Sequence, residues 1–254
     1  MTMQTGAKLM TGAEAVIKTA VAAGIDVCFA NPGTTELSLV QALDRCPEIR
    51  SVLAVFEGVC TGAADGYTRV SGRPALALLH LGPGLANGIA NLHNARKARS
   101  PVISVVGEHA TWHIAANAPL TSDIATLAQP MSHWVHTTTR PESAAADMAE
   151  AIVQATRLPG GPATLILPGD VQWAQVSVAP VAPTIPAPAS PNVDETERAA
   201  RALRSGTVAL VLGGRALRAS GLKAADRIAR ATGCRVPVSG RRGGGGWGGG
   251  DSGW

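Results

Sequence analysis

Short apolar runs alternate with longer amphipathic segments over most of the chain. The short runs predict β-strands at residues 26–30, 51–56, 75–80, 101–106 and 163–167. Apolar residues at helical spacing between them predict helices at 11–24, 35–45, 58–70, 85–98, 121–128 and 143–157. Strands that alternate with helices of this length favour a parallel sheet with helices on both faces. We therefore predict an α/β fold with a doubly wound parallel sheet.

The first predicted helix has clear start and stop signals. Thr11 and Glu14 have the spacing of a capping box, and Gly24 follows the last apolar position. These signals predict that the helix ends before the strand at 26–30.

A proline-rich segment separates this region from a second one. Residues 179–193 contain five prolines, which favours a semi-rigid extended linker. Beyond it, the pattern predicts a single βαβ unit, with helices at 194–204 and 219–232 and strands at 207–212 and 234–238. Such a unit is too small to be a stable domain alone. We therefore predict a first domain at 8–178, a linker at 179–193, and an incomplete second α/β unit at 194–238.

The composition changes abruptly after residue 238. Residues 239–254 read SGRRGGGGWGGGDSGW, and glycine contributes no apolar side chain to a packed element. We expect this segment to be a disordered tail. Its abrupt start favours a frameshift or a premature end in a longer coding sequence, which would make the chain a truncated form of a longer protein. A natural flexible tail is the alternative.

Composition and charge narrow the classes of function. Hydrophobic residues make up 46% of the chain and charged residues 16%, which suits a buried sheet. The net charge is +4, but Lys and Arg are scattered, so we expect no nucleic-acid partner. The four cysteines lack metal-site spacing, and the pairs His109/His113 and His133/His136 lack a third ligand, so we predict no metal site. No apolar run approaches the roughly 18 residues of a membrane span. We expect a cytoplasmic protein without membrane association.

The segment from Val52 to Asn87 carries the residues best suited to chemistry. One predicted strand ends just before Glu57, and the next ends just before His80 and the predicted turn Gly82-Pro83-Gly84. Open α/β sheets bind ligands at the carboxyl ends of their strands. We therefore expect Glu57 and His80 to lie at that edge, where a carboxylate and an imidazole are able to transfer protons.

The same residues also suit structural roles. Glu57 fits the first turn of a helix, where the helix dipole favours an acid. His80 fits a hydrogen-bonded histidine at a strand end. The loop from Asn31 to Glu36 fits an ordinary Pro-Gly turn in which Thr34 or Thr35 caps the next helix.

The order of these residues resembles the pyrimidine-binding domain of thiamine-diphosphate (ThDP) enzymes of the acetolactate synthase and benzoylformate decarboxylase group. The resemblance is carried by Val52–Asn87 and by Asn31-Pro32-Gly33-Thr34-Thr35-Glu36, which is similar to the first active-site loop of this family. It covers residues 8–175 well and residues 195–238 loosely. It implies a doubly wound pyrimidine-binding domain, followed by a truncated second unit that is the start of the family's central domain.

The resemblance also implies roles for individual residues. Glu57 would hydrogen-bond the ring nitrogen of the cofactor's pyrimidine and so activate the cofactor, which itself supplies the electron sink. His80 resembles the acid/base histidine of benzoylformate decarboxylases. Thr34 stands where those enzymes have a serine that contacts the substrate carboxylate. The remaining implied cofactor contacts are Pro32, Gly33, Gly82, Pro83, Gly84 and Asn87.

The implied function is that of a lyase or transferase that uses ThDP to act on a 2-oxo acid, as a homodimer or tetramer. The family holds Mg²⁺ and the cofactor diphosphate with a Gly-Asp-Gly motif in a C-terminal domain. Gly169-Asp170-Val171 does not match that motif, so we expect the magnesium site to be missing and the chain to be inactive alone.

Two other functions stay open at this point. One is a non-catalytic binding or interaction module with the same fold. The other is a nucleotide-binding enzyme, which Gly213-Gly214 at a predicted strand end suggests, although no Gly-x-Gly-x-x-Gly follows a strand. A downstream reading frame that encodes Gly-Asp-Gly would favour the enzyme over the module.

Overall fold

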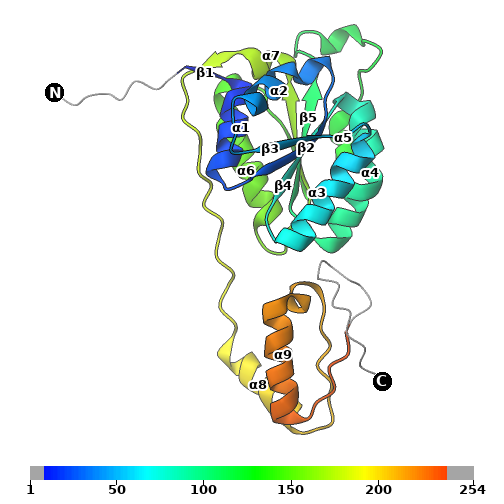
Figure 1. Ribbon diagram of the computed structural model, residues 1–254, viewed down its shortest axis with the longest axis vertical. Helices are drawn as coiled ribbons and strands as arrows, with labels where there is room; N and C mark the ends of the chain where they lie inside the picture. Colours follow the sequence, from blue (N-terminus) through cyan, green and yellow to red (C-terminus); the bar gives the residue numbers. More distant parts are fainter. Residues whose placement is uncertain (1–8, 239–254) are drawn as a thin grey trace, which may run out of the picture. The chain divides into compact units, whose positions relative to one another are not determined.

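The chain folds into two compact units, the first ending at Pro186 and the second beginning at Ala187. The structure is a computed structural model that describes residues 9–238, so the tail predicted at 239–254 lies outside the described residues (Figure 1). The division between the units falls within the proline-rich segment. Between residues 9 and 238, no helix is long and apolar enough to cross a membrane.

A sheet of six parallel strands forms the centre of the first unit, which confirms the predicted doubly wound α/β fold. In spatial order the strands are β3 (Arg50–Leu53), β2 (Val27–Asn31), β4 (Ala75–Leu79), β5 (Val102–Glu108), β7 (Ala163–Pro168) and β6 (Trp134–Thr137). A short antiparallel pair lies apart from this sheet and consists of β1 (Met10–Thr11) and β8 (Gln175–Val176).

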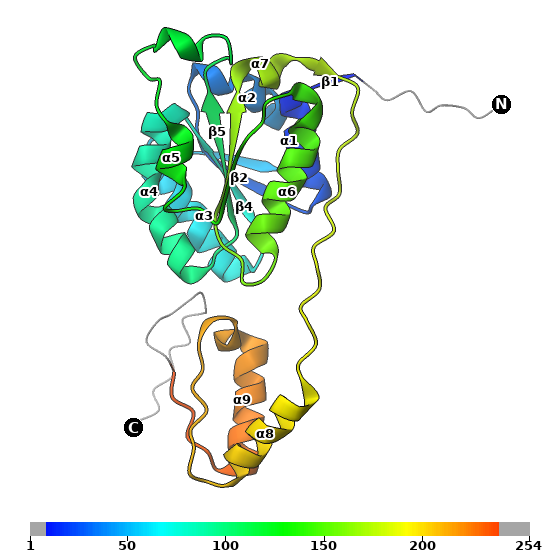
Figure 2. The same cartoon turned by 180° about the vertical axis from the view of Figure 1, so that it is seen from behind.

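Helices cover both faces of the sheet (Figures 1 and 2). One layer contains α1 (Gly12–Ala22), α2 (Leu37–Asp44), α6 (Ala144–Thr156) and α7 (Gly169–Trp173). The other contains α3 (Glu57–Ser71), α4 (Leu81–Ala98) and α5 (Ile124–Ala128). Three short 3₁₀ segments complete the unit, at η1 (Thr34–Glu36), η2 (Ile114–Ala116) and η3 (Pro141–Ser143).

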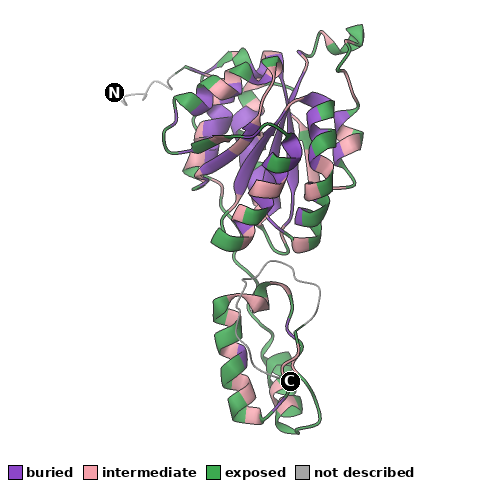
Figure 3. Cartoon of the chain, turned by 45° about the vertical axis from the view of Figure 1, so that its right-hand side comes forward, coloured by how far each residue is buried: buried purple, intermediate pink, exposed green. Residues whose placement is uncertain are grey.

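The central strands are buried along their whole length (Figure 3). Alternate residues of β4 supply the two cores: Leu76 and Leu78 pack against the α1, α2 and α6 layer, and Ala77 and Leu79 pack against α3 and α4. This two-sided burial explains why the strands read as continuous apolar runs in the sequence.

The predicted capping box at the start of α1 is present. The Thr11 hydroxyl accepts a hydrogen bond from the Glu14 N–H at 3.1 Å, and the Glu14 carboxylate accepts one from the Thr11 N–H at 2.9 Å. The bond from the Thr11 N–H lowers the pKa of Glu14.

Two predicted element boundaries, next to Glu57 and His80, are wrong. The strand predicted at 51–56 ends at Leu53, three residues earlier than predicted, and the helix predicted to begin at residue 58 begins at Glu57. Gly82-Pro83-Gly84 is not a free turn but part of the first turn of α4. Leu81 takes a left-handed backbone with φ 51°, which lets the chain pass directly from β4 into the helix, and a first helical turn does not need the N–H that Pro83 lacks.

Strand β6 was not predicted, because it reads as a mixed polar segment. It lies at the edge of the sheet, and each of its residues is at least partly exposed. An edge strand does not need the continuous apolar pattern of the central strands.

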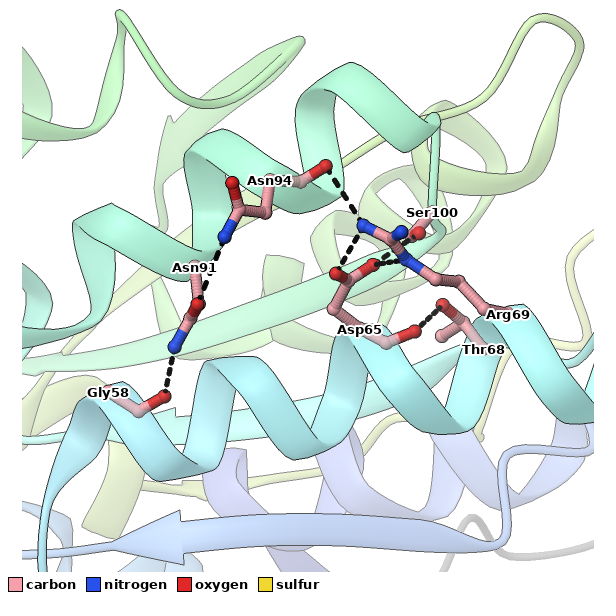
Figure 4. A network of polar contacts seen from close by, with 7 residues as sticks. All are labelled: Gly58, Asp65, Thr68, Arg69, Asn91, Asn94 and Ser100. Carbon is pink, nitrogen blue, oxygen red and sulfur yellow. Dashed lines mark hydrogen bonds and ion pairs between the residues drawn. The ribbon is translucent and has the colours of Figure 1, made fainter. Parts of the chain in front are cut away.

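A network of polar side chains fastens α3 to the end of α4 (Figure 4). Asp65 is 7% exposed, and its carboxylate accepts hydrogen bonds from Arg69 Nε at 2.8 Å, Arg69 Nη2 at 2.6 Å and Ser100 Oγ at 2.5 Å. Arg69 also donates to the backbone oxygen of Asn94 at 3.2 Å. A buried carboxylate with three donors is compensated for its lost hydration.

The same two helices also meet closely where the first turns of α3 lie against the middle of α4. Thr61 Oγ1 donates to the backbone oxygen of Gly88 at 3.0 Å, and Asn91 Nδ2 donates to that of Gly58 at 2.7 Å. A Cβ atom on Gly88 would lie 2.9 Å from the Thr61 methyl group, so the missing side chain allows this approach. The packing holds the first residue of α3 beside the first turns of α4.

The second unit contains α8 (Val193–Arg204), η4 (Gly214–Leu217) and α9 (Ala219–Thr232). The strands predicted at 207–212 and 234–238 are wrong as strands, because only the isolated bridges Ala209↔Arg235 and Leu212↔Val238 link these segments. Helix α8 buries no residue, and α9 buries only Ala225. Two segments with so little buried surface do not form a stable ladder.

We expect Arg99→Gly to raise the free energy of unfolding of the first unit by about 0.5–1 kcal/mol. Arg99 is exposed and caps α4 in the left-handed region with φ 57°, a conformation that glycine adopts without the steric cost of a Cβ atom. Lys97→Gly, inside the last turn of the same helix, should instead lower the stability by about 1 kcal/mol. Urea denaturation followed by circular dichroism compares the two variants. Equal destabilisation by both would contradict the assigned cap.

We expect Arg69→Gln to lower the stability of the first unit by about 2–3 kcal/mol, because it removes the cation from a buried carboxylate. The control is Arg45→Gln, which breaks a 2.9 Å ion pair to Glu14 whose arginine side chain is 64% exposed. That change should cost about 0.5 kcal/mol or less. Thermal or urea denaturation measures both, and similar losses would show that burial of Asp65 does not strengthen its ion pair.

Candidate active site

The predicted acid and histidine both lie at the carboxyl edge of the sheet. His80 follows the last residue of β4, and Glu57 begins the helix that follows β3. The loop after β2 contributes Gly33 and Glu36, and β5 ends there at Glu108. Strands that run parallel bring these separated segments to one edge.

Glu57 is buried with one carboxylate oxygen bound and the other available. Glu57 is only 7% exposed, and Asn87 Nδ2 donates a hydrogen bond to its Oε2 at 2.9 Å. No described residue donates to Oε1. A Cβ atom on Gly84 would lie 3.0 Å from Oε1, so this oxygen faces a backbone that carries no side chain. The carboxylate is therefore able to accept a hydrogen bond from a further N–H group.

His80 is held against the loop that follows β2. Its Nδ1 lies 2.7 Å from Glu36 Oε2, and a Cβ atom on Gly33 would lie 2.3 Å from the ring. The backbone oxygen of His80 accepts a hydrogen bond from the Gly84 N–H at 2.8 Å. The side chain is 23% exposed, and no described residue hydrogen-bonds to Nε2. The imidazole thus has one anchored nitrogen and one available nitrogen.

Glu36 is a member of this site that sequence reasoning missed. It is 0% exposed, and its Oε2 accepts a hydrogen bond from the Gly33 N–H at 2.8 Å in addition to the His80 contact. The Thr35 hydroxyl donates to Oε1 at 2.6 Å. The signal in the sequence was an acid at the end of the Pro-Gly loop, but its partner His80 lies 44 residues away.

The His80 and Glu57 side chains lie on opposite faces of the sheet. His80 continues the row of Leu76 and Leu78, which faces α1, α2 and α6, and there it meets Glu36. Glu57 lies with α3 and α4 on the other face. Gly84 lies between the two groups, because a Cβ atom there would be 3.0 Å from Glu57 Oε1 and 3.4 Å from His80 Cβ.

Glu108 is a second buried acid that the sequence reading missed. It is 7% exposed, and its Oε1 accepts a hydrogen bond from the His109 N–H at 2.7 Å. Burial raises the pKa of Glu108, and the nearby Glu36 carboxylate adds to this rise. The signal was an acid two residues after the apolar run at 101–106 that predicted β5.

The predicted site residues divide into two groups. Described contacts join Gly33, His80, Gly84, Glu57 and Asn87. The others are adjacent in sequence but make no described contact with Glu57 or with the His80 ring: Pro32, Thr34, Gly82 and Pro83. Their roles toward a ligand stay predictions.

The remaining members differ from one another in surroundings. Thr34 is exposed at the start of η1. Gly82 lies against Ser122, whose Cβ would be 2.2 Å from a Cβ atom at that position, so the loop after β5 packs on the first turn of α4.

The histidine pairs do not combine into a metal centre. The His109 and His113 rings meet edge to face with centroids 5.5 Å apart, and His136 pairs instead with Asp147 at 3.3 Å. In the described part of the chain, no group of three or more His, Cys, Asp or Glu side chains is placed to hold a metal ion.

Comparison with known proteins identifies relatives of this chain. Residues 10–133 match the family model described as the thiamine pyrophosphate enzyme N-terminal TPP binding domain. A protein of Mycobacterium tuberculosis with the provisional name acetolactate synthase large subunit IlvX is 53% identical over 227 residues, which cover 89% of this chain and 44% of that protein. Benzoylformate decarboxylase of Pseudomonas aeruginosa is 33% identical over 159 residues, which cover 62% of this chain and 30% of the enzyme.

A solved structure shows the same architecture. The ThDP-dependent 4-hydroxybenzoylformate decarboxylase of Rhodococcus jostii superposes with a TM-score of 0.82 at 27% identity, over 91% of this chain and 44% of that one. The chain thus spans less than half the length of each of these relatives. The domain match, the relatives and the shared fold agree, and the chain therefore belongs to the thiamine pyrophosphate enzyme family, whose N-terminal TPP-binding domain its first unit carries.

Proposed function

We propose that the first unit binds the pyrimidine half of ThDP, and that the protein which uses it is a lyase or transferase acting on a 2-oxo acid. The observation that carries this proposal is the Glu57 carboxylate. Asn87 fixes one of its oxygens, and the other faces the bare backbone of Gly84. An oriented, buried acceptor next to an open backbone suits a flat heterocycle that presents an N–H group.

The residues of this edge fit the cofactor in other respects. ThDP supplies an electron sink for carbanion chemistry, and the protein supplies position and electrostatics. Glu57 would accept the hydrogen bond from the pyrimidine ring nitrogen. Gly84, and with it Gly33, Gly82, Pro32 and Pro83, would leave the backbone accessible to the ring. His80 would donate or remove substrate protons through Nε2, and the Thr34 hydroxyl would bind the substrate carboxylate.

The named relatives support the substrate class. Acetolactate synthases and benzoylformate decarboxylases are enzymes of 2-oxo acids, and the chain matches both groups. We further propose a homodimer or tetramer in which Mg²⁺ and the diphosphate are held by a C-terminal domain, as the resemblance to the family implies. This chain by itself should then be inactive.

An anionic substrate would be repelled by ionised acids at this edge of the sheet, and Glu108 is one of these acids. A 2-oxo acid is an anion, and the edge of the sheet already carries Glu36, Glu57 and Glu108 as buried acids. Glu36 has His80 as a partner, and Glu57 would share its hydrogen bond with the cofactor. Glu108 has only a backbone N–H. Burial raises the pKa of Glu108, so the penalty for a third carboxyl group at this edge is smaller than for a fully exposed acid that keeps its ordinary pKa.

We expect thiamine and ThDP to bind this chain with similar affinity, weaker than a dissociation constant of about 10 μM, which corresponds to roughly −7 kcal/mol. The reason is that all the contacts proposed here go to the pyrimidine and none to the diphosphate. A titration of the ¹⁵N-labelled chain should move the amide signals of Glu57, Gly84 and Asn87.

The matched variants for this titration are Glu57→Gln and Glu48→Gln, an exposed acid on the same unit. The first should weaken the shifts at Gly84, and the second should not. Absence of any shift at Gly84 with saturating thiamine would contradict the proposal and favour a non-catalytic module. Tight, Mg²⁺-dependent binding of ThDP alone would contradict the proposed division of the site.

We expect Glu108→Gln to stabilise the first unit increasingly as the pH rises. Because folding raises the pKa of Glu108, the folded state holds the proton more tightly than the unfolded state. Its contribution to stability is therefore complete below the ordinary glutamate pKa of about 4.3 and is lost as the pH rises through the folded value. Urea denaturation from pH 4 to pH 8 measures the difference between variant and parent. A gap that stays constant with pH would show that Glu108 ionises normally, and Glu48→Gln again serves as control.

A further inference from the structure

We propose that Glu36 is a positioning residue that anchors Nδ1 of His80, so that the imidazole keeps its proton on Nδ1 and presents Nε2 to the substrate. This inference rests on the proposed function, in which His80 is the acid/base group. It adds a residue to which no role was assigned from the sequence, and it specifies which nitrogen of His80 reacts.

Glu36 is a buried acid without a Lys or Arg partner among the described residues. The residue is 0% exposed, and no described Lys or Arg forms an ion pair with it. A carboxylate removed from water needs hydrogen-bond donors in place of its hydration. Glu36 receives them from the Gly33 N–H at 2.8 Å and the Thr35 hydroxyl at 2.6 Å, and His80 Nδ1 at 2.7 Å is the third. A carboxylate only accepts, so the hydrogen in the last contact belongs to Nδ1.

Two separate glycines make room for this pair. A Cβ atom on Gly107 would lie 1.7 Å from Glu36 Oε1, and one on Gly33 would lie 2.3 Å from the His80 ring. Neither glycine has a positive φ, so backbone conformation does not require glycine at these positions. Glycine is needed because a side chain at either position would overlap the Glu36–His80 pair. One glycine follows β2, and the other lies near the end of β5.

The backbone after His80 is also held in a costly conformation. Leu81 has φ 51° and is 1% exposed, although only glycine takes the left-handed region without strain. Strain of this kind persists where the surrounding packing determines it, and it gathers at functional sites. Here it turns the chain into α4 immediately after the histidine whose Nδ1 meets Glu36.

The chemical consequence follows from the imidazole. A neutral ring carries its proton on one nitrogen, and the partner of the other nitrogen decides which one. With Nδ1 donating to Glu36, Nε2 has a free lone pair to accept a proton from substrate. When Nε2 takes that proton, the resulting cation lies beside a carboxylate. The 23% exposure of the side chain leaves that nitrogen a route to the site.

A purely structural role is the alternative. Glu36 also accepts from the Gly33 N–H three residues back, and so closes the first turn of η1. Glu36→Gln preserves this turn, because the amide oxygen still accepts from Gly33 and from Nδ1–H. Glu36→Ala removes both contacts. Thr35→Val removes the hydroxyl that donates to Glu36 Oε1 at 2.6 Å and lies 3.3 Å from His80 Nδ1, but it leaves both contacts of Oε2 in place.

The test is the tautomer of His80, read from ring ¹⁵N shifts of the histidine-labelled chain at a pH where imidazoles are neutral. We expect at least about a ten-fold excess of the Nδ1–H form in the parent, the size that one hydrogen bond to a charged group supports. Glu36→Gln and Thr35→Val should keep that excess. Glu36→Ala should lose it and shift the ring toward the Nε2–H form.

Three outcomes would overturn the inference. These are an Nε2–H tautomer in the parent, an unchanged tautomer in Glu36→Ala, and a loss of the preference in Thr35→Val equal to that in Glu36→Ala. If Glu36→Ala does not fold, the parent and Glu36→Gln still decide the question. The measurement needs no cofactor, so a failure of thiamine to bind is distinguishable from a failure of the Glu36–His80 contact.

Discussion

The need to bury carboxylates at one edge of a parallel sheet governs the arrangement of this unit. Three acids lie there with 7% exposure or less, and each is accommodated differently. Glu36 is surrounded by donors. Glu57 has one donor and one available oxygen. Glu108 has a single backbone N–H, and burial shifts it toward its neutral form. Three chemically identical side chains thus differ in their hydrogen-bond partners, and in Glu108 burial also raises the pKa.

Close approach of backbones makes these environments possible. Helices α3 and α4 meet through small residues, with Thr61 against Gly88 and the Asp65 network at the far end. Because the two helices are fixed at both ends, the first residue of α3 has little freedom relative to the first turns of α4. The position of Glu57 beside Gly84 is therefore a property of the whole helix pair and not of a flexible loop.

The sequence allowed the layers, and the position of Glu57 and His80 at the carboxyl edge of the sheet, to be predicted, because these depend on local pattern. Continuous apolar runs marked the central strands, and His80 directly follows one of them, whereas Glu57 follows the apolar run that contains edge strand β3. Glu36 was missed because its meaning depends on His80, a partner distant in sequence. The turn at Gly82-Pro83-Gly84 was wrong because local composition cannot show the left-handed Leu81 that starts α4. Edge strand β6 and the second unit bury few residues, so their sequences lack the apolar pattern from which strands are predicted.

The empty space at Gly107 has a consequence for anyone who diversifies this domain. A methyl group there would collide with Glu36 at 1.7 Å, so alanine, the mildest of replacements, would disturb the Glu36–His80 pair without altering either residue. A mutant library that keeps only residues with functional side chains constant would still vary Gly107 and so disturb the Glu36–His80 pair. Gly107 should therefore be kept constant in a redesign, just as Glu36 and His80 are.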